Sequence, residues 1–403
     1  ITVDESIAED ILATQADTAV VVGTVSDYLT AKGDAKLYNI NLPAGVYLQA
    51  QLTTPANADL DYDLYLLDAE GNILTGSDYY TYINGTAGTL PEALGYITSG
   101  DTATYYLYVL ASEGGSVSES FTLDYSVSTA CDSYEIDESV RQALAFTYGA
   151  GGAYIESRNL SSPIDNDWYV ITVPSSRIYD KLKISATTAS TNTCSVEVYQ
   201  NVASEGYQMK RVGSGNTISV SSGKYYIRVS NAKTMENFDD LDIQNYKLSI
   251  TPILKATGIV ITDLKGSEGL NKVVNYPGYG AHFRTQGSGT LTVYGVLTAT
   301  DSSTGVTYAV GGEQINGLYY SPAWEANNTS ANAIRRGTGT TDSSGKFEID
   351  ISLPPGIGVY SYYGSTSTHY FDICGVSVSP SDDSSISASE TIFHLAYTMY
   401  HPF

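Results

Sequence analysis

Basic residues are scarce in this chain of 403 residues, which has 20 Lys and Arg against 44 Asp and Glu and a formal net charge of −24. Nucleic acids and anionic membrane surfaces bind clustered Lys and Arg, so this balance argues against both as partners. No apolar run approaches the ~18 residues that a transmembrane helix needs. The sequence therefore predicts no nucleic-acid partner and no membrane span.

Cysteine is also rare, with one residue each at Cys131, Cys194 and Cys374. Because no Cys-x-x-Cys pair occurs, the sequence excludes zinc ribbons, dithiol redox motifs and c-type haem attachment. Two alternatives stay open: all three are reduced core thiols, or Cys131 pairs with Cys194 and Cys374 is a buried thiol. The chain starts at Ile1 without Met, as it would after removal of a signal peptide or at a boundary cut within a longer chain.

Motifs for catalysis are missing. The four histidines lie in the last 150 residues, at His282, His369, His394 and His401. No His-Glu-x-x-His or Gly-x-Ser-x-Gly motif occurs, and a serine triad would need a positioned Ser that no pattern marks. We therefore predict neither catalytic nor cofactor-binding residues, and a chain that is not an enzyme.

Strand patterns dominate what is present. Tyr is frequent, at 35 residues against eight Phe, and short apolar or alternating runs recur between turn residues. Weak helical periodicity occurs at 138–146 and 7–13. Many short strands about ten residues apart predict an all-β chain of tandem β-sandwiches, jelly-roll or Ig-like in type. The clearest strands are 47–52, 105–110, 121–126 and 225–229.

Charge and an internal repeat divide the chain into three predicted domains: 1–130, 131–253 and 254–403. The first has 18 acids and two bases, the second 14 and 11, and the third 12 and 7. The first two domains share segments, which indicates a duplication of about 120–130 residues. The matching pairs are 42–47 with 220–225, 105–109 with 225–229, and the closing strands 120–127 with 244–250.

Four motifs in order support a family resemblance for the second domain: Asp-Ser-Tyr-Glu-Ile-Asp-Glu-Ser at 132–139, Asp-Asn-Asp-Trp-Tyr at 165–169, and the strands 222–229 and 246–250. Residues 131–253 thereby resemble a bacterial pre-peptidase C-terminal domain, a jelly-roll-like β-sandwich appended to many secreted proteins. Residues 1–130 are similar in degenerate form, with 33–38 in place of the Asp-x-Asp-Trp-Tyr element and a good match at 61–71.

The third domain has a different pattern. Residues 340–351 are similar to the edge-turn segment of transthyretin-like and other Ig-like surface modules, in which Asp-Ser-Ser-Gly joins two alternating strands. We interpret 276–280 and 317–332 as loop-like insertions.

Two groups of carboxylates are candidate calcium sites. The family resemblance implies calcium ligands at Glu135, Asp137, Asp165 and Asp167. Apart from any family, two acidic clusters ~30 residues apart would repel each other unless a cation or an Arg lies between them. The alternative is that these side chains are solvated turn residues that cap strands and a short helix.

The second group is Asp59, Asp61 and Asp63, which alternate along the chain. On a strand they would share one face about 7 Å apart, where calcium would relieve their repulsion. The alternative is an exposed acidic face.

These features together predict a non-enzymatic secreted or cell-surface structural protein, such as a subunit of an extracellular filament, sheath or surface layer. The alternative is an extracellular carbohydrate- or matrix-binding protein. Clustered aromatic residues would then form the glycan platform, and in sandwiches such Tyr residues also serve as cross-strand pairs. The clusters are 79–82, Tyr319-Tyr320 with Trp324, and 360–363.

The last segment, 391–400, alternates as a strand with four apolar residues on one face: Phe393, Leu395, Tyr397 and Met399. One alternative is that it is simply the last strand of its own sandwich. The other is that it adds to a sheet edge of a second subunit, which predicts self-association into a polymer.

Overall fold

The computed structural model describes most of the chain. The described residues are those outside 1–8, 11–19, 58, 78–81, 84–85, 88–90, 189–193, 203–208, 215, 233–243, 268–270, 277–279, 285–287, 327–332, 357, 364–365, 371 and 402–403. Within them the regular elements are strands apart from the short helix α1 (Pro322–Ala326), which confirms the predicted all-β class. No described helix has the length and apolarity to cross a membrane.

The first domain is a sandwich of two sheets, with the small β7 (Tyr82–Ile83) and β8 (Thr86–Ala87) pair beside it. One sheet has the order β1 (Glu9–Asp10), β3 (Ala35–Leu42), β10 (Ala103–Glu113), β5 (Asp61–Leu67), β6 (Ile73–Ser77). The other has the order β2 (Val20–Asp27), β11 (Phe121–Ser128), β4 (Tyr47–Thr53), β9 (Glu92–Ile97).

The second domain repeats this plan strand for strand. Its first sheet has the order β12 (Leu144–Ala145), β14 (Asn166–Val173), β19 (Gly223–Asn231), β16 (Cys194–Asn201), β17 (Met209–Ser214). Its second sheet has the order β13 (Ala153–Leu160), β20 (Gln244–Leu254), β15 (Tyr179–Thr188), β18 (Thr217–Ser219). In both domains the short first strand pairs in parallel with its neighbour, β1 with β3 and β12 with β14. The predicted duplication is therefore visible in the topology.

One of the sequence matches behind that prediction is wrong. Residues 105–109 and 225–229 lie on the equivalent strands β10 and β19, and the closing strands β11 and β20 also correspond. Segment 42–47, however, leads into β4, whose counterpart is β15, whereas 220–225 leads into β19. Both segments are turns before a Tyr-led strand, so they share a turn pattern without sharing a position in the fold.

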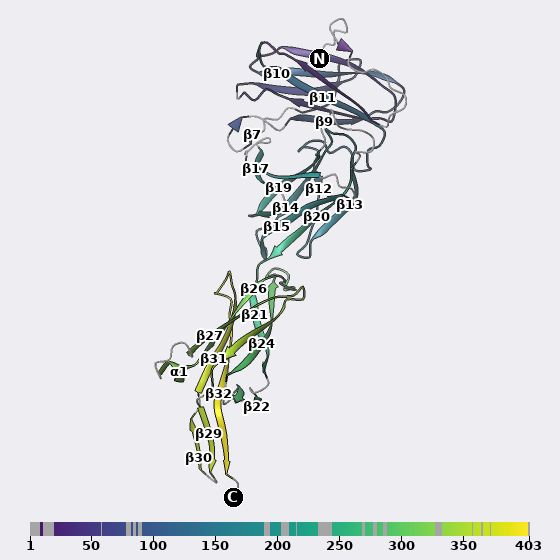
Figure 1. Cartoon of the computed structure of the whole chain (residues 1–403). Helices are drawn as coiled ribbons and strands as arrows, with labels where there is room; N and C mark the ends of the chain where they lie inside the picture. Colours follow the sequence, from purple (N-terminus) through teal and green to yellow (C-terminus); the bar gives the residue numbers. More distant parts are fainter. Residues whose placement is uncertain are drawn as a thin grey trace. The chain divides into compact units, whose positions relative to one another are not determined.

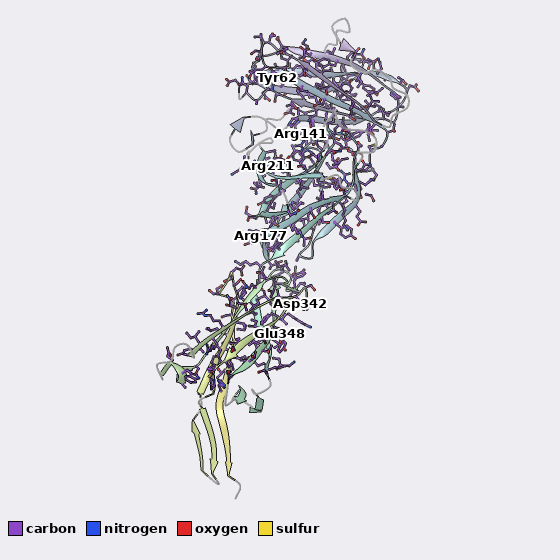
Figure 2. The ribbon with its side chains drawn as sticks, viewed as in Figure 1. Tyr62, Arg141, Arg177, Arg211, Asp342 and Glu348 are labelled. Carbon is purple, nitrogen blue, oxygen red and sulfur yellow. The ribbon has the colours of Figure 1, made fainter. Side chains whose placement is uncertain are left out.

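Alternating apolar residues form the core between the two sheets of each sandwich. In the first domain, Tyr62 on β5 meets Phe121 on β11 edge-to-face, with ring centroids 6.2 Å apart (Figure 2). In the second, Tyr169 on β14 reaches Tyr246 on β20 across the two sheets, with hydroxyl oxygens 2.5 Å apart. Trp168 on β14 and Tyr199 on β16 belong to one sheet and pack on its outer face, with ring centroids 5.6 Å apart. The four strands singled out in the sequence are β4, β10, β11 and β19, and all are confirmed.

The third domain has its own two sheets (Figure 1). One contains β21 (Gly258–Gly266), β24 (Gly289–Thr300), β25 (Thr307–Ala309) and β28 (Lys346–Leu353). The other runs β22 (Asn271–Tyr276), β23 (Gly280–Arg284), β32 (Ala388–His401), β31 (Asp372–Pro380), β26 (Gln314–Tyr320), β27 (Ile334–Thr340), with β29 (Gly358–Tyr363) and β30 (Thr366–Tyr370) joined through β32.

The predicted Asp-Ser-Ser-Gly turn does join two strands, β27 and β28. The Asp342 carboxylate (Figure 2) accepts hydrogen bonds from the backbone of Ser344 at 2.8 Å and Lys346 at 2.9 Å, and Gly345 has a φ of 75°. The two strands lie in different sheets, so the turn carries the chain across the sandwich and does not close a hairpin.

The chain divides into two compact units. The first two sandwiches form one unit, from Ile1–Ser175 and Asp180–Ile253, and the third forms the other, from Ser176–Tyr179 and Leu254–Phe403. The predicted boundary near 253 agrees with this division. No described sheet crosses 130, yet the first two sandwiches pack as one body, and the candidate site lies where they meet.

Two expectations about local structure are wrong. Residues 138–146 form no helix, because Glu138 and Val140 are buried at the junction and Leu144–Ala145 pair as β12. The supposed insertion at 317–332 begins with the last residues of β26 and includes α1. In the segment 7–13, where the sequence shows weak helical periodicity, the structure describes only Glu9–Asp10, and these two residues form strand β1. In the predicted insertion at 276–280, residues 277–279 lie outside the described residues.

Candidate metal centre

Three segments meet at the junction of the first two sandwiches. The connection between them supplies residues 135–139, the start of β14 supplies residues 165–167, and β4 of the first sandwich supplies Tyr47 and Gln49. Gly95 on β9 makes this close approach feasible. A Cβ there would lie 2.5 Å from the Tyr47 hydroxyl and 2.8 Å from side-chain carbons of both Glu138 and Ile136.

The four predicted calcium ligands of this site do come together. Carboxylate oxygens of Glu135, Asp137 and Asp167 lie within 4.8 Å of one another, and so do those of Glu135, Glu138 and Asp165. Asp137, Glu138, Asp165 and Asp167 are all buried, at 0–1% exposure, which excludes the alternative of solvated turn residues for them, and Glu135 is half-buried. Glu138 is the member of this cluster that the sequence prediction missed.

Arg158 on β13 occupies one half of this cluster. Its guanidinium lies 2.7 Å from both Asp132 and Asp167, contacts Asp137, and is fully buried. Its Nε donates to the Tyr169 hydroxyl at 2.7 Å. Although burial opposes the charged form, the carboxylates of Asp167 and Asp137 outweigh it and raise the pKa of Arg158. The sequence predicted that a cation or an Arg relieves the repulsion between the acidic clusters. For Asp137 and Asp167 this partner is Arg158.

The other half of the cluster, formed by Glu135, Glu138 and Asp165, has hydrogen-bond donors but no described cation. Glu138 accepts hydrogen bonds from Gln49 Nε2 at 2.6 Å and from the Asn166 backbone at 3.1 Å. The Tyr47 hydroxyl lies 2.7 Å from Glu138 and 2.9 Å from Glu135. A hydroxyl has one proton and can donate it to only one carboxylate at a time. The second contact needs a proton on a carboxyl group or a cation shared with it.

Several buried oxygens at this point have no hydrogen-bond donor among the described residues: Gln49 Oε1, Glu135 Oε1, Asp137 Oδ1 and Asp165 Oδ1. The Ser161 backbone and the Ser161 hydroxyl, the latter at 2.8 Å, both donate to the other oxygen of Asp165. Uncompensated buried acceptors are unfavourable, and hard cations such as calcium take six to eight oxygen ligands. The donor set of carboxylates, an amide oxygen and a hydroxyl fits calcium.

Burial changes the acidity of these groups. Desolvation and the Asp165 carboxylate raise the pKa of Glu135 to about 8. Desolvation raises the pKa of Asp165 to about 6, although the hydrogen bonds from Ser161 oppose it. Burial, together with Asp165 and Glu135, raises the pKa of Glu138 well above its ordinary range. Without a metal ion, protons must neutralise part of the cluster.

The turn in the first sandwich that corresponds to the Ser161–Asp165 turn shows which features are specific to the second sandwich. Asp34 accepts from the Thr30 backbone at 2.9 Å and from its hydroxyl, as Asp165 accepts from Ser161, and the two aspartates are 131 positions apart. Asp34 is only partly buried, and these hydrogen bonds lower its pKa. The same turn thus holds an ordinary acid in one repeat and a buried one in the other.

The neighbouring ion pair is reversed between the repeats. Arg158 and Asp167 in the second sandwich stand where Asp27 and Lys36 stand in the first, each again 131 positions apart. Both pairs are 2.7 Å long, but the Lys36 and Asp27 side chains are 37% and 21% exposed, whereas Arg158 and Asp167 are at 0%.

The second predicted calcium site does not form as expected. β5 begins at Asp61, so Asp59 lies in the preceding turn and cannot share a strand face with the other two residues. Asp63 is buried and has Tyr65 and Ser112 hydroxyls at 3.3 and 3.4 Å. No metal-ligand group among the described residues includes any of the three aspartates.

The predicted aromatic platform loses its central member. Tyr319 is fully buried, and its hydroxyl lies 2.8 Å from His394 Nδ1 and 3.1 Å from the Cys374 sulfur. Trp324 donates through its ring nitrogen to the Pro355 carbonyl at 3.0 Å. The side chains of 79–82 and 360–363 lie outside the described part of the structure. Tyr319 is therefore a core residue, whereas Tyr320 and Trp324 are half-buried, so the predicted glycan platform there is reduced to these two side chains.

The cysteines are thiols in this structure, including Cys131 and Cys194, so the pairing alternative is not realised, and Cys374 is buried as expected. The last predicted strand is β32. It pairs with β31 and β23 of its own sheet, with Phe393 opposite Ile373 and His282. The side chains of Phe393, Leu395, Tyr397 and Met399 lie outside the described part, and only their backbone is described.

No protein-family model matches the chain. The uncharacterized protein YlqB of Bacillus subtilis (strain 168) is 36% identical over 74 residues, which are 18% of this chain and 46% of that protein. The match thus spans about half the length of this relative. The resemblance to pre-peptidase C-terminal domains remains a prediction.

Among solved structures, similar chains include PliG of Aeromonas hydrophila, a periplasmic inhibitor of g-type lysozyme (TM-score 0.21, 10% identity, 30% of this chain and 96% of that one). The CUB1-EGF-CUB2 domains of rat MASP-1 have a TM-score of 0.18 and 11% identity, over 57% of this chain and 97% of that one. The CBM22 tandem of Paenibacillus barcinonensis Xyn10C has a TM-score of 0.17 and 12% identity, over 62% of this chain and 99% of that one. Scores this low establish neither a shared fold nor a shared function.

Proposed function

We propose that this protein is a non-enzymatic structural protein of the cell surface or extracellular space, and that calcium locks its first two sandwiches into one rigid unit. The observation that carries the calcium proposal is the group Glu135, Glu138 and Asp165, whose oxygens lie within 4.8 Å of one another without a described cation. Calcium would replace the protons that otherwise keep these buried carboxyl groups neutral.

The ligands come from both sandwiches, which is why binding would affect their connection. Glu135, Glu138 and Asp165 belong to the second repeat, and Gln49 Oε1 and the Tyr47 hydroxyl belong to β4 of the first. An ion bound among them cross-links the two domains. Arg158 supplies the fixed charge for the remaining carboxylates, so one divalent ion has a defined place.

An extracellular location supports the same proposal. Modules outside cells commonly bind calcium with Kd values of ~10⁻⁴–10⁻³ M. Stiffness between tandem sandwiches is what a subunit of a filament, sheath or surface layer requires. The absence of catalytic motifs in the sequence favours such a structural role.

The test uses the full chain, stripped of metal with a chelator and then titrated with calcium during thermal unfolding. Calcium at 100 times its Kd would stabilise the folded unit by ~2.7 kcal/mol, which is a shift of several degrees in Tm. The double variant E138Q/D165N replaces two buried carboxyl groups with neutral amides, so no proton is needed to neutralise them. It should unfold at a higher temperature than the metal-free parent and no longer respond to calcium.

The control is E70Q, which removes an exposed charge from the turn after β5 and should keep the full calcium shift. A parent chain whose Tm does not change with millimolar calcium would contradict the proposal. A double variant that still shifts would place the calcium elsewhere.

A further inference from the structure

The end of β32 has an open edge. Residues 388–394 pair with β31, and Ile392–Leu395 pair with β23 on the other side. From Leu395 to His401 the strand pairs in parallel with β29, which pairs with β30. Figure 1 shows this three-stranded ribbon continuing beyond the ends of β31 and β26, with β29 on the side of β32 that β31 occupies. Among the described residues, no strand covers the opposite edge of β32 beyond Leu395.

This edge has no charged residue to protect it. β29, β30 and 395–401 contain no Asp, Glu, Lys or Arg, in a chain with a net charge of −24. Every other described edge strand of six or more residues carries at least one charge: β2, β9, β13, β17, β21, β22, β27 and β28. Charges on edge strands are a common means of preventing pairing with another chain. The end of β32 lacks that protection.

We infer that the open edge of β32, from Ala396 to His401, binds the same edge of a second copy of this chain as an antiparallel pair. The net charge of −24 makes two copies repel each other, and this uncharged edge is a place where they can meet without adding to that repulsion. The sequence Ala-Tyr-Thr-Met-Tyr-His contains β-branched and aromatic residues that favour strands, and six paired residues extend about 20 Å.

This contact has a defined symmetry. A strand edge that pairs with its own copy obeys a two-fold axis, so the contact closes at two copies and does not propagate. It therefore differs from a head-to-tail addition of the tail, for which β32 would have to leave the sheet in which it already pairs with β31 and β23. A filament would need a second contact elsewhere. The inference does not depend on calcium or on the junction site.

The test measures the mass of the full chain against concentration, by sedimentation equilibrium with chelator present. We expect a monomer–dimer equilibrium that strengthens from 50 to 500 mM NaCl, because salt screens the repulsion between the acidic chains. T398K places a like charge from each copy in the paired edge and should weaken dimerisation about tenfold or more.

The matched control is T368K on β30, the strand at the other edge of the same ribbon. It should leave the dimer unchanged. A chain that stays monomeric at millimolar concentration in high salt would overturn the inference. So would loss of the dimer in T368K with retention in T398K, which would assign the contact to β30. Open-ended growth beyond a dimer that T398K does not reduce would also overturn it.

Discussion

The hydroxyl of Tyr47 in the first sandwich lies 2.7 Å from the carboxylate of Glu138, which belongs to the connection into the second. Both side chains are at 1% exposure. This contact ties the electrostatics of the buried cluster to the packing of two domains. Changes on either side of the junction should therefore alter both the stability of the unit and its response to calcium.

Removing that hydroxyl should weaken the unit and its affinity for calcium. Y47F leaves Glu138 and Glu135 without a shared donor, and a lost hydrogen bond to a buried charged group costs roughly 1–3 kcal/mol. Denaturant unfolding with and without calcium measures both effects. Y62F is the control, because the Tyr62 hydroxyl donates to the Leu29 carbonyl, at 3.3 Å within the first sandwich. If Y47F and Y62F show the same calcium shift, the Tyr47 hydroxyl does not contribute to binding.

The close approach at β9 gives a second prediction. G95A would put a methyl group within 2.8 Å of the Tyr47 hydroxyl and of carbons of Glu138 and Ile136, so the connection must move. We expect a loss of roughly 1–3 kcal/mol from overpacking and a weaker calcium shift. At Gly149 an added Cβ meets nothing within 4 Å, so G149A should have little effect. Equal stability of the two variants would contradict the described packing.

Stability should depend on pH in a direction opposite to that of most acidic proteins. Burial raises the pKa of Glu135 to about 8, so its folded form holds a proton that the unfolded form loses near pH 4.5. The stabilisation is present below pH 4.5 and is lost as the pH rises towards 8, by at most ~1.4 kcal/mol per pH unit for one group. The groups around it that titrate or carry charge are Tyr47, Asp132, Asp137, Glu138, Arg158, Asp165 and Asp167.

Denaturant unfolding of the metal-free chain at pH 5, 6, 7 and 8 measures this dependence. Unfolding free energy should fall across the series, and saturating calcium should flatten the fall because the ion replaces the protons. Constant or rising stability in chelator would show that the cluster does not hold its protons.

The reversed ion pairs provide an internal comparison. R158M removes a fully buried cation and leaves Asp137 and Asp167 unpaired, which should destabilise the unit by roughly 3–5 kcal/mol. K36M alters the equivalent but partly exposed pair of the first sandwich and should change stability by about 1 kcal/mol or less. Thermal unfolding of both variants checks the difference. Similar losses would mean that burial does not distinguish the two pairs.

The sequence predicted the sandwiches and most of this cluster for a physical reason. Alternation along strands such as β10 and β28 directly records which residues face a core. Acids at 135–137 and 165–167 also attract attention, because local crowding of like charge needs an explanation. The sequence predicted that a cation or an Arg lies between the acidic clusters, but it did not predict that this Arg is Arg158.

Two contributors could not be predicted in the same way. Glu138 fell in a weak helical pattern, and only the docking of the first sandwich buries it. Gln49 lies on β4 between Leu48 and Ala50, on the face that a single sandwich would expose to solvent, and the second domain covers it. Contacts between domains leave no periodicity in the sequence. The sole hint was that the outward positions Tyr47, Gln49 and Gln51 are uncharged in a strongly acidic domain.

The most direct test of the central claim is calorimetric titration of calcium into the metal-free full chain at pH 7, beside the E138Q/D165N variant. The structure predicts a site in the parent that releases protons on binding, seen as a heat that changes with the ionisation enthalpy of the buffer. The variant should lose this site. Identical isotherms for the two chains, or no binding at millimolar calcium, would contradict a calcium lock between the two sandwiches.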